Sequence, residues 1–310
     1  MPVRSNVRNV EIRGVFIEDT FAEAFGMRAS RIIVTARNLK WARIAALKLT
    51  GFATSVIACK CEAAIERDLG EGDTPDGRPG VSVLFFTMDS DSLGKRLIER
   101  IGQTVLTCPT TSCFDGLPES PDRLPSGRAI RVFGDRYQIS KVIGGQRYWR
   151  VPVMEGEFLL SESFGMQKKS VAGGNFLILA EDEDAALAAA EAAVTAIDGS
   201  PDVILPFPGG VVRSGSKVGA RGYGGMIAST NDAYCPTLRP LVASALPDGV
   251  NCVLEIVLDG LSADAIHAAM RKGIDAACID GVRAISAGNY GGKLGPYHFH
   301  LRQIMNGAPA

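Results

Sequence analysis

The sequence has no marked excess of charge of either sign. It contains 33 Lys and Arg residues against 34 Asp and Glu residues, which gives a net charge of −1. Because proteins that bind nucleic acids are usually basic overall, this balance argues against such a partner. No uncharged apolar run is long enough to span a bilayer, since even the alanine-rich stretch 185–197 is interrupted by Glu191. Residues 1–14 are charged and lack the apolar region of a secretory signal. We therefore expect a cytoplasmic protein without membrane or nucleic-acid partners.

Residues that bind metals are scarce or badly spaced. Of the three histidines, His298 and His300 could share one face of a strand, but no third ligand is evident and an exposed strand is favoured. The seven cysteines are odd in number and scattered, as expected of reduced thiols. Cys59 and Cys61 would share a strand face, yet no second pair follows them. We expect no metal site.

Several common motifs are absent as well. No Ser-His-Asp or Cys-His arrangement can be argued, and there is no G-x-S-x-G nucleophile elbow. The glycine-rich stretches 206–210 and 214–225 match neither the P-loop nor the dinucleotide-binding pattern. Turns are the favoured interpretation of these glycines.

What the sequence does contain is an internal repeat. Residues 74–102 and 246–274 each have a Pro-Asp-Gly turn, a β-rich apolar run, an Asp and an amphipathic helix. Upstream, residues 29–51 and 173–199 are each a strand followed by a helix. The expected residues at the helix ends are Asn38, Asp182 and Ser262 as N-caps and Gly51 and Gly199 as terminating glycines.

Each half therefore predicts the order β-α-β…β-α-β of a ferredoxin-like unit, in which two helices cover one face of an antiparallel sheet. We predict an α+β protein of two such α/β-sandwich lobes, residues 1–135 and residues 136–310. At the start of the second lobe, Gly144 and Gly145 separate two strand-like runs within residues 137–153 and predict an inserted hairpin.

One acidic residue does not fit its surroundings. Glu255 interrupts the apolar strand predicted within residues 251–260, and it shares a strand face with Val253 and Val257. A carboxyl group on such a face is costly to ionise, so its pKa is expected to rise. The alternative is a half-exposed strand with Glu255 in solvent. Alignment of the two Pro-Asp-Gly turns, with two residues absent from the second copy, places Glu255 at Phe85 or Phe86 of the first.

Eight collinear blocks between about residues 14 and 301 resemble one known family. They are IEDTFAEAFGM (17–27), TGFATSVI (50–57), TPDGRPGV (74–81), MEGEF (154–158), VAGGNF (171–176), PFPGGVV (206–212), STNDAYCPT (229–237) and ISAGNYGGKLG (285–295). This pattern resembles formylmethanofuran–tetrahydromethanopterin formyltransferase. The resemblance implies two α/β-sandwich lobes and transfer of a formyl group between the amine of a methanofuran-type carrier and N5 of tetrahydromethanopterin. It also implies that both carriers are substrates, that no metal or bound cofactor takes part, and that the enzyme is a homo-oligomer, typically a tetramer.

The balanced charge, an extended basic N-terminus and an altered segment at 120–150 resemble the variant from methylotrophic bacteria. This implies a role in one-carbon metabolism and formaldehyde oxidation, as a subunit of a formyltransferase/hydrolase complex with hydrolase subunits as partners. The alternative is a non-catalytic structural subunit of that assembly. The intact Glu255 within the retained motifs favours the enzyme.

The implied reaction needs a group that manages protons and donors that stabilise the oxyanion of a tetrahedral intermediate. Glu255 is the candidate for the first role, because a carboxyl group of raised pKa can donate and then accept a proton near neutral pH. Ser112 and Asn231 are the candidate oxyanion donors. Further candidates for substrate binding are polar residues, basic residues that would suit anionic groups, and aromatic residues that could pack on a carrier ring: Thr110, Thr111, Ser286, Asn289, Arg213, Lys217, Arg221, Lys293, Phe207 and Tyr234. The alternatives are ordinary turn residues and a solvated basic face.

Overall fold

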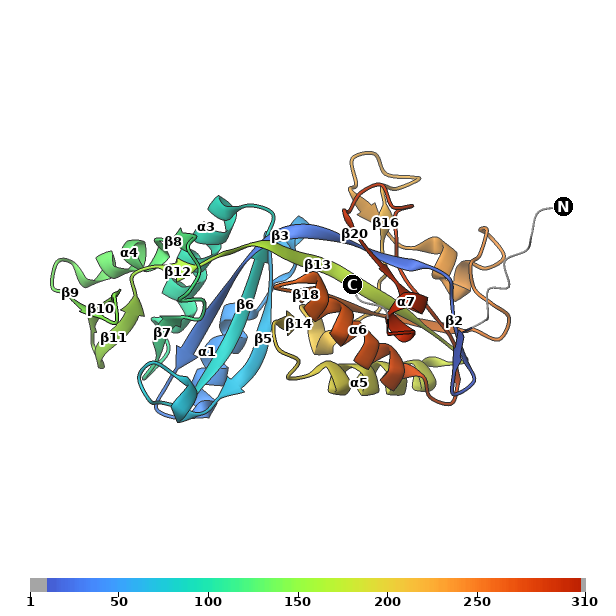
Figure 1. Ribbon diagram of the computed structural model, residues 1–310. Helices are drawn as coiled ribbons and strands as arrows, with labels where there is room; N and C mark the ends of the chain where they lie inside the picture. Colours follow the sequence, from blue (N-terminus) through green and yellow to red (C-terminus); the bar gives the residue numbers. More distant parts are fainter. Residues whose placement is uncertain (1–9, 308–310) are drawn as a thin grey trace.

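Two long antiparallel strands run through both halves of the molecule and join them (Figure 1). In the computed structural model, which describes residues 10–307, these are β3 (Phe21–Thr35) and β13 (Gln167–Ala180). The two strands pair with each other between Gln167↔Ala29 and Ala172↔Phe25, where the lobes meet. The far end of each strand then enters the sheet of one lobe, so a single continuous sheet links the two.

The first lobe is a ferredoxin-like unit with strand order β7-β3-β6-β5. Its elements are α1 (Leu39–Thr50), β5 (Cys61–Leu69), β6 (Gly80–Thr87), α3 (Ser90–Arg100) and β7 (Ser112–Asp115). Asn38 caps α1 as predicted, since its side chain accepts the N–H of Trp41 at 3.2 Å. Leu93 and Leu97 of α3 are buried on the sheet, whereas Ile98 faces outward.

The second lobe repeats this order as β19-β13-β18, with β14 and β15 on the far edge of β18. Its elements are α5 (Glu183–Ile197), β14 (Val203–Ile204), β15 (Val211–Val212), β18 (Cys252–Gly260), α6 (Ala263–Ala277) and β19 (Val282–Ser286). Asp182 and Ser262 cap α5 and α6 by accepting the N–H groups of Ala185 and Ala265. The predicted repeat and its two α/β lobes are therefore confirmed.

Small side chains let the helices of the second lobe pack closely. Ala186, Ala189, Ala190 and Ala193 of α5 are all buried against the sheet and α6. On α6, a Cβ added to Gly273 would lie only 2.6 Å from Ile197 Cδ1. Larger residues would overpack this contact, which typically destabilises a core by about 1–3 kcal/mol. The tight packing fixes β18, which carries Glu255, against the helical layer.

The ends of the two halves are exchanged between the lobes. The predicted hairpin forms, with β9 (Ile139–Ile143) and β10 (Gln146–Val153) joined through Gly144 and Gly145 at positive φ. However, β11 (Gly156–Ser161) pairs with β7, so the hairpin extends the sheet of the first lobe rather than opening the second. Conversely, β1 (Val10–Ile12) and β2 (Val15–Ile17) lie beside β19 in the second lobe. The division into domains at residues 135 and 136 stays a prediction.

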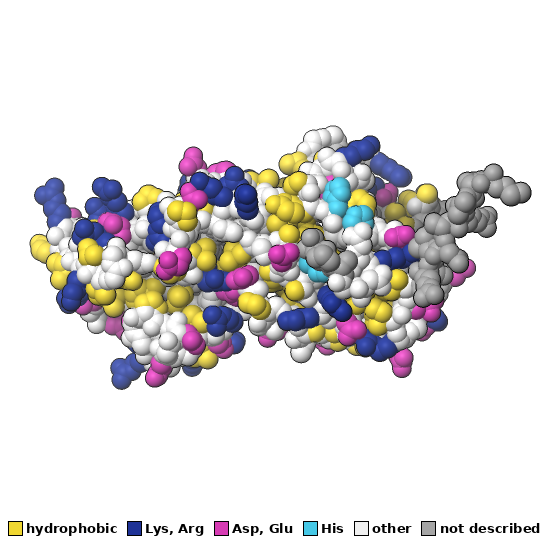
Figure 2. All heavy atoms as spheres, viewed as in Figure 1, with side chains coloured by type: hydrophobic (Ala, Val, Ile, Leu, Met, Phe, Trp, Pro, Cys, Tyr) yellow, Lys and Arg dark blue, Asp and Glu magenta, His cyan; other side chains and the backbone are white. Residues whose placement is uncertain are grey.

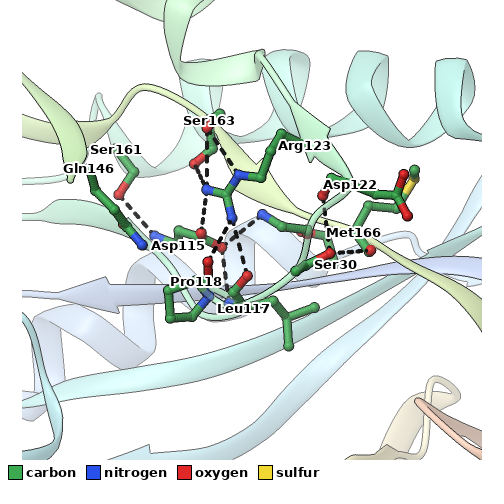
Figure 3. A network of polar contacts seen from close by, with 12 residues as sticks. Ser30, Asp115, Leu117, Pro118, Asp122, Arg123, Gln146, Ser161, Ser163 and Met166 are labelled. Carbon is green, nitrogen blue, oxygen red and sulfur yellow. Dashed lines mark hydrogen bonds and ion pairs between the residues drawn. The ribbon is translucent and has the colours of Figure 1, made fainter. Parts of the chain in front are cut away.

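A buried carboxylate shapes the loop that follows β7 (Figure 3). Asp115 Oδ1 accepts the N–H groups of Leu117 and Gly165 at 3.0 and 2.9 Å, and Oδ2 pairs with Arg123 at 2.5 Å. Arg123 also donates to the carbonyl and hydroxyl of Ser163. This network holds β8 (Arg123–Leu124) against β12 (Phe164–Gly165), the segment that leads into β13.

The remaining regular elements are short. They are β4 (Thr54–Ser55), α2 (Val56–Cys59), α4 (Ser126–Ile130), β16 (Lys217–Val218), β17 (Ala228–Ser229), β20 (Tyr297–His300) and α7 (Leu301–Met305). Cys59 ends α2 and Cys61 begins β5, so the expectation that both lie on one strand face was wrong. All seven cysteines are free thiols.

Charged groups of both signs are scattered over the face shown in Figure 2, without a large patch of one sign. Of the helices within residues 10–307, none is long and apolar enough to cross a membrane. The same residues contain no group of three or more His, Cys, Asp or Glu side chains that could hold a metal ion. The basic N-terminal segment at residues 1–9 lies outside the described residues.

Candidate functional site

The helix caps, rather than the Pro-Asp-Gly turns, set the register between the two copies. Glu255 pairs with Leu177 of β13, and Ser82 pairs with Ile33 of β3. Glu255 and Ser82 each precede the N-cap of the following helix by seven residues, at Ser262 and Asp89. The counterpart of Glu255 is therefore Ser82, and the predicted match to Phe85 or Phe86 was wrong. The turn misled the alignment because the chain between turn and strand is one residue longer in the second copy.

The structural counterpart of Phe86 is a different acid, Asp259. Both residues lie three positions before the N-cap of their helix. Phe86 is fully buried in the first lobe, and Asp259 is fully buried in the second. Along β18, two carboxyl groups thus replace a hydroxyl and an aromatic ring of the first copy.

Glu255 lies on the face of β18 that points away from the helices. Its strand neighbours Ile256 and Leu258 point the other way, into the core under α5 and α6. The segment between β14 and β18 returns over the Glu255 face, where Val212 of β15 pairs with Glu255. Between this segment and the sheet lies a cavity of about 500 Å³, and Glu255 lines it.

Burial controls the protonation of Glu255. The side chain is half-buried, and no hydrogen bond or charge of the described residues contributes to its protonation. Loss of hydration raises the pKa of Glu255 from 4.5 to about 7. A substantial fraction of the carboxyl group is therefore neutral at neutral pH, as the apolar strand predicted.

Both lobes contribute to the wall of this cavity. From the first come the ring of Phe25, the start of α2 and Met88; from the second come Gly173, Asn175 and Val257. Phe207, predicted from the sequence as a substrate-binding ring, also lines it, together with Ser214 and Ser216. An apolar cavity with a few convergent polar groups is the usual form of a small-molecule site.

A second acid that lines the cavity, the buried Glu23 on β3, was not predicted. Its Oε2 accepts the N–H groups of Tyr290 and Gly292 at 2.7 and 2.8 Å, and its Oε1 accepts those of Leu294 and Gly295 at 2.5 and 2.7 Å. Although burial opposes ionisation, these four backbone hydrogen bonds lower the pKa of Glu23 to about 2. The carboxylate therefore organises the loop that brings Tyr290 into the cavity wall.

Asn175 and Asn289 fix the same loop from two further sides. Asn175 exchanges hydrogen bonds with Gly288, accepting its N–H at 2.6 Å and donating to its carbonyl at 3.1 Å. Asn289, predicted to bind substrate, instead donates to Thr20 and to the carbonyl of Phe21. Its observed contacts are those of a loop-positioning residue.

Three predicted residues lie outside the cavity, at the other end of the first lobe. Ser112 Oγ accepts a hydrogen bond from Arg78 at 2.7 Å. Thr111 Oγ1 donates to the carbonyl of Val105, and the backbone N–H of Thr110 donates to Glu155. These contacts support the turn after α3, and none of the three residues lines the cavity.

The remaining predicted residues lie around the covering segment. Lys217 and Arg221 both pair with Asp232, at 2.6 and 3.4 Å, and Lys217 is the main cause of the lowered pKa of that carboxyl. Asn231 precedes this acid and lies against Gly215, which lines the cavity.

Further along the same sheet face, Tyr234 exchanges a hydrogen bond with Ser286 at 3.2 Å, and Ser286 donates to Glu18 at 2.5 Å. Arg213 and Lys293 are exposed. His298 and His300 lie on exposed β20 beside the ring of Phe21. The structure thus brings Glu255 and Phe207 into one cavity, with Asn231 at its margin.

Comparison with known proteins assigns the family over both lobes. Residues 10–153 match the model of formylmethanofuran-tetrahydromethanopterin formyltransferase, and residues 156–304 match the model of its proximal lobe. The chain is 60% identical over 301 residues to the enzyme of that name from Methylobacillus flagellatus, covering 95% of this chain and 99% of the relative. It is also 60% identical over 298 residues to the one from Methylococcus capsulatus, with the same coverage.

A solved structure agrees with the sequence comparison. The formyltransferase/hydrolase complex from Methylorubrum extorquens, crystallised with methylofuran, contains a chain that superposes with a TM-score of 0.93 at 49% identity, covering 96% of this chain and 99% of that one. The match to this family extends over both lobes and includes the repeat and the sequence blocks quoted above. The chain belongs to the formylmethanofuran–tetrahydromethanopterin formyltransferase family.

Proposed function

We propose that this chain catalyses the reversible transfer of a formyl group between the amine of a methanofuran-type carrier and N5 of tetrahydromethanopterin. The observation that carries the proposal is Glu255, a carboxyl group with a pKa of about 7 in an apolar cavity, in a chain whose relatives bear the name of this activity. At neutral pH such a carboxyl group is populated in both its protonated form, which can donate a proton, and its ionised form, which can accept one.

The proposed transfer proceeds through a tetrahedral intermediate. The N5 amine attacks the formyl carbon of formylmethanofuran, and the formyl oxygen gains negative charge as the C–N5 bond forms. Neutral Glu255 donates a hydrogen bond to this oxyanion and then gives its proton to the leaving amine as the old C–N bond breaks. The resulting carboxylate takes the surplus proton from N5, which regenerates neutral Glu255. The reverse reaction follows the same steps in the opposite order.

The cavity offers flat surfaces for two heterocyclic carriers. Phe25, Phe207 and Tyr290 line it, and the first and last pack with ring centroids 6.2 Å apart. Asn231 remains the proposed oxyanion donor because it borders the cavity beside Gly215. Ser112 does not enter the proposal, because its hydroxyl is buried at the far end of the first lobe with Arg78. Arg213 and Lys293 are proposed to meet anionic parts of the carriers, since both are exposed.

The same family supports proposals about assembly. We propose a cytoplasmic homo-oligomer, a tetramer or dimer of dimers, that associates with hydrolase subunits and uses the two carriers as substrates without a resident cofactor. The support is the Methylorubrum extorquens formyltransferase/hydrolase complex, whose matching chain is 49% identical to this one. A non-catalytic subunit would have no need for Glu255, so its retention in an apolar cavity favours the enzyme.

Purified chain, assayed alone and with its natural partner subunits, should transfer formyl from formyl-tetrahydromethanopterin to a methanofuran-type acceptor. Glu255→Gln should fold and lose most of this activity, whereas Glu191→Gln on the exposed face of α5 should retain it. If the wild-type chain were inactive in the presence of its partner subunits, the proposed formyltransferase activity would be excluded. Equal activity of wild type and Glu255→Gln would exclude the proposed role of Glu255 alone.

A further inference from the structure

A buried acid of the second lobe has no role in the transfer as proposed. Asp259 is 0% exposed and lies on the same face of β18 as Glu255, four residues along the strand. Its counterpart in the first lobe is the apolar ring of Phe86, so the fold itself does not require an acid at this position. A fully buried acid is costly to keep unless its oxygens are hydrogen-bonded.

Only one of the two carboxylate oxygens of Asp259 accepts a hydrogen bond from an N–H group of the described residues. Oδ1 accepts the N–H of Gly173 at 3.2 Å, whereas Oδ2 is reached by no N–H or cationic donor of residues 10–307. Oδ2 is thus a fully buried oxygen without a hydrogen-bond partner among the described residues, and the neighbouring titratable group that acts on Asp259 is the Glu62 carboxyl of the first lobe. Glu62 Oε1 in turn accepts the N–H of Val56 at 3.1 Å. Two carboxylates cannot form a hydrogen bond without a proton between them.

We propose that Glu62 and Asp259 share a single proton and act as a positioning pair that clamps the two lobes together across the substrate cavity. One end of the clamp is the first residue of α2, Val56, and the other is the β-bulge at Gly173. Val56 and Gly173 both line the cavity, from opposite lobes. The pair therefore sets the spacing between two walls of the site. This inference rests on the proposed function in taking that cavity as the substrate site.

The cross-strand neighbours of the pair carry no charge. Across the strands, Glu62 faces Thr54 and Phe86, while Asp259 faces Ala172 and Ile204. Phe86, Ala172 and Ile204 belong to one apolar cluster that contains residues of both lobes. Among residues 10–307, no Lys, Arg or His is a cause of the pKa shift of either acid.

The other titratable groups nearby have separate environments. Glu255 lies further along β18 in the cavity, and Glu23 is fully occupied by four backbone N–H groups. Further along β5, Glu66 is paired with Arg31, which also pairs with Asp202 in the turn before β14. These carboxyl groups therefore have their own surroundings and are not part of the Glu62–Asp259 pair.

Burial favours the protonated form of the pair. Burial raises the pKa of both groups, and the neighbouring Glu62 carboxyl raises that of Asp259 further. The pair then holds one negative charge, and the hydrogen bond from the Val56 N–H to Glu62 Oε1 stabilises it. Because the folded-state pKa is raised, the clamp is present at low and neutral pH and is lost as alkaline pH removes the shared proton. Two adjacent carboxylates would then repel each other and separate the walls.

Two substitutions of Asp259 distinguish the bridge between the lobes from the acidic group itself. Asp259→Asn replaces the shared proton by an amide N–H that donates to Glu62, while its oxygen still accepts from Gly173. Asp259→Leu has the same branched shape and number of side-chain heavy atoms but cannot bridge the lobes, and the ring of Phe86 at the equivalent position shows that an apolar residue fits such a site. For wild type we expect KM for the carriers to rise reversibly at alkaline pH, before loss of structure.

We expect the KM of Asp259→Asn for the carriers to stay low and not to rise at alkaline pH. Asp259→Leu should have a KM raised about tenfold at every pH, the effect of losing one charge-assisted hydrogen bond, with a much smaller change in kcat. The pair would be refuted as a positioning device if Asn and Leu variants shared one KM and both kept the wild-type pH profile.

A spectroscopic measurement tests the shared proton without relying on activity. In an infrared pH titration of wild-type protein, a carboxylic-acid carbonyl band should persist above the pH at which Glu255 ionises. Asp259→Asn should abolish this band, while Glu255→Gln should leave it intact. Persistence of the band in Asp259→Asn would overturn the shared proton, whatever the outcome of the formyl-transfer assay.

Discussion

Glu255→Gln should make the protein more stable at the pH where it abolishes catalysis. The pKa of Glu255 rises from 4.5 to about 7 on folding, because burial disfavours the ionised form. This difference corresponds to about 3 kcal/mol of destabilisation once the folded carboxyl group must ionise. Gln has nearly the same shape and no charge, so it escapes this penalty.

The sign of the effect depends on pH in a defined way. Well below pH 4.5 the carboxyl group is protonated in both states, so wild type and variant should be equally stable. Between pH 4.5 and about 7 the unfolded chain releases its proton while the folded protein keeps it, and wild type loses stability relative to the variant. Above pH 7 both states are ionised and the gap stays constant at about 3 kcal/mol.

The measurement is the free energy of unfolding by urea at matched protein concentration from pH 5 to pH 8.5. The advantage of the Gln variant should grow by roughly 2–3 kcal/mol over this range. Glu191→Gln, on the exposed face of α5, should show no such growth. A difference between Glu255→Gln and wild type that did not change with pH would refute the raised pKa, and with it the proposed proton chemistry.

Three further predictions concern catalysis, the cavity loop and the repeat. In the formyl-transfer assay, Glu255→Gln should lower kcat by about 10²–10⁴-fold, the usual contribution of a general acid–base group, and unchanged kcat would remove it from the mechanism. The amide of Glu23→Gln cannot accept all four N–H groups that the carboxylate accepts. The free energy of unfolding should therefore fall by about 1–3 kcal/mol, and backbone hydrogen exchange should become faster from Tyr290 to Gly295. Unchanged exchange in this segment would contradict the role of Glu23 in organising the loop. Ser262→Ala removes the N-cap of α6 and should lower stability by about 1 kcal/mol with wild-type KM, whereas a large change in KM would indicate a direct role in the site.

Local features of the fold could be predicted because they depend on nearby residues. Asn38, Asp182 and Ser262 each cap the helix that the sequence assigned to them. Gly144 and Gly145 form the expected hairpin turn, since both must adopt positive φ. The strand order within each lobe followed from the repeated β-α-β pattern.

Features that depend on pairing between distant segments could not be predicted in this way. No local pattern shows that β11 joins β7 or that β2 lies beside β19. The register of Glu255 was also misjudged, because loops of different length separate the turn from the strand in the two copies. Strand pairing across such distances is determined by the complete fold, not by the local sequence.

The candidate site was predicted in part for the same reason. Glu255 was found because a single acid in an apolar strand is visible in the sequence itself. Glu23, Glu62 and Tyr290 were missed as individual residues, although three of the blocks that carried the family resemblance lie at or beside them. Ser112 was selected for its position after a strand, but that strand end belongs to the far side of the first lobe.

The exchanged ends of the two lobes constrain the order in which the chain can fold during synthesis. Ser286 donates a hydrogen bond to Glu18, 268 residues earlier in the sequence, and β2 forms its parallel pairing with β19 in the same region. A ribosome therefore releases β2 long before its partner strand exists. Val15 and Ile17, which are buried in the folded core of the second lobe, cannot reach that environment until β19 has been made. Closure of the second core therefore depends on residues made late in synthesis, and a chain that lacks β19 cannot form the pairing that helps to bury β2.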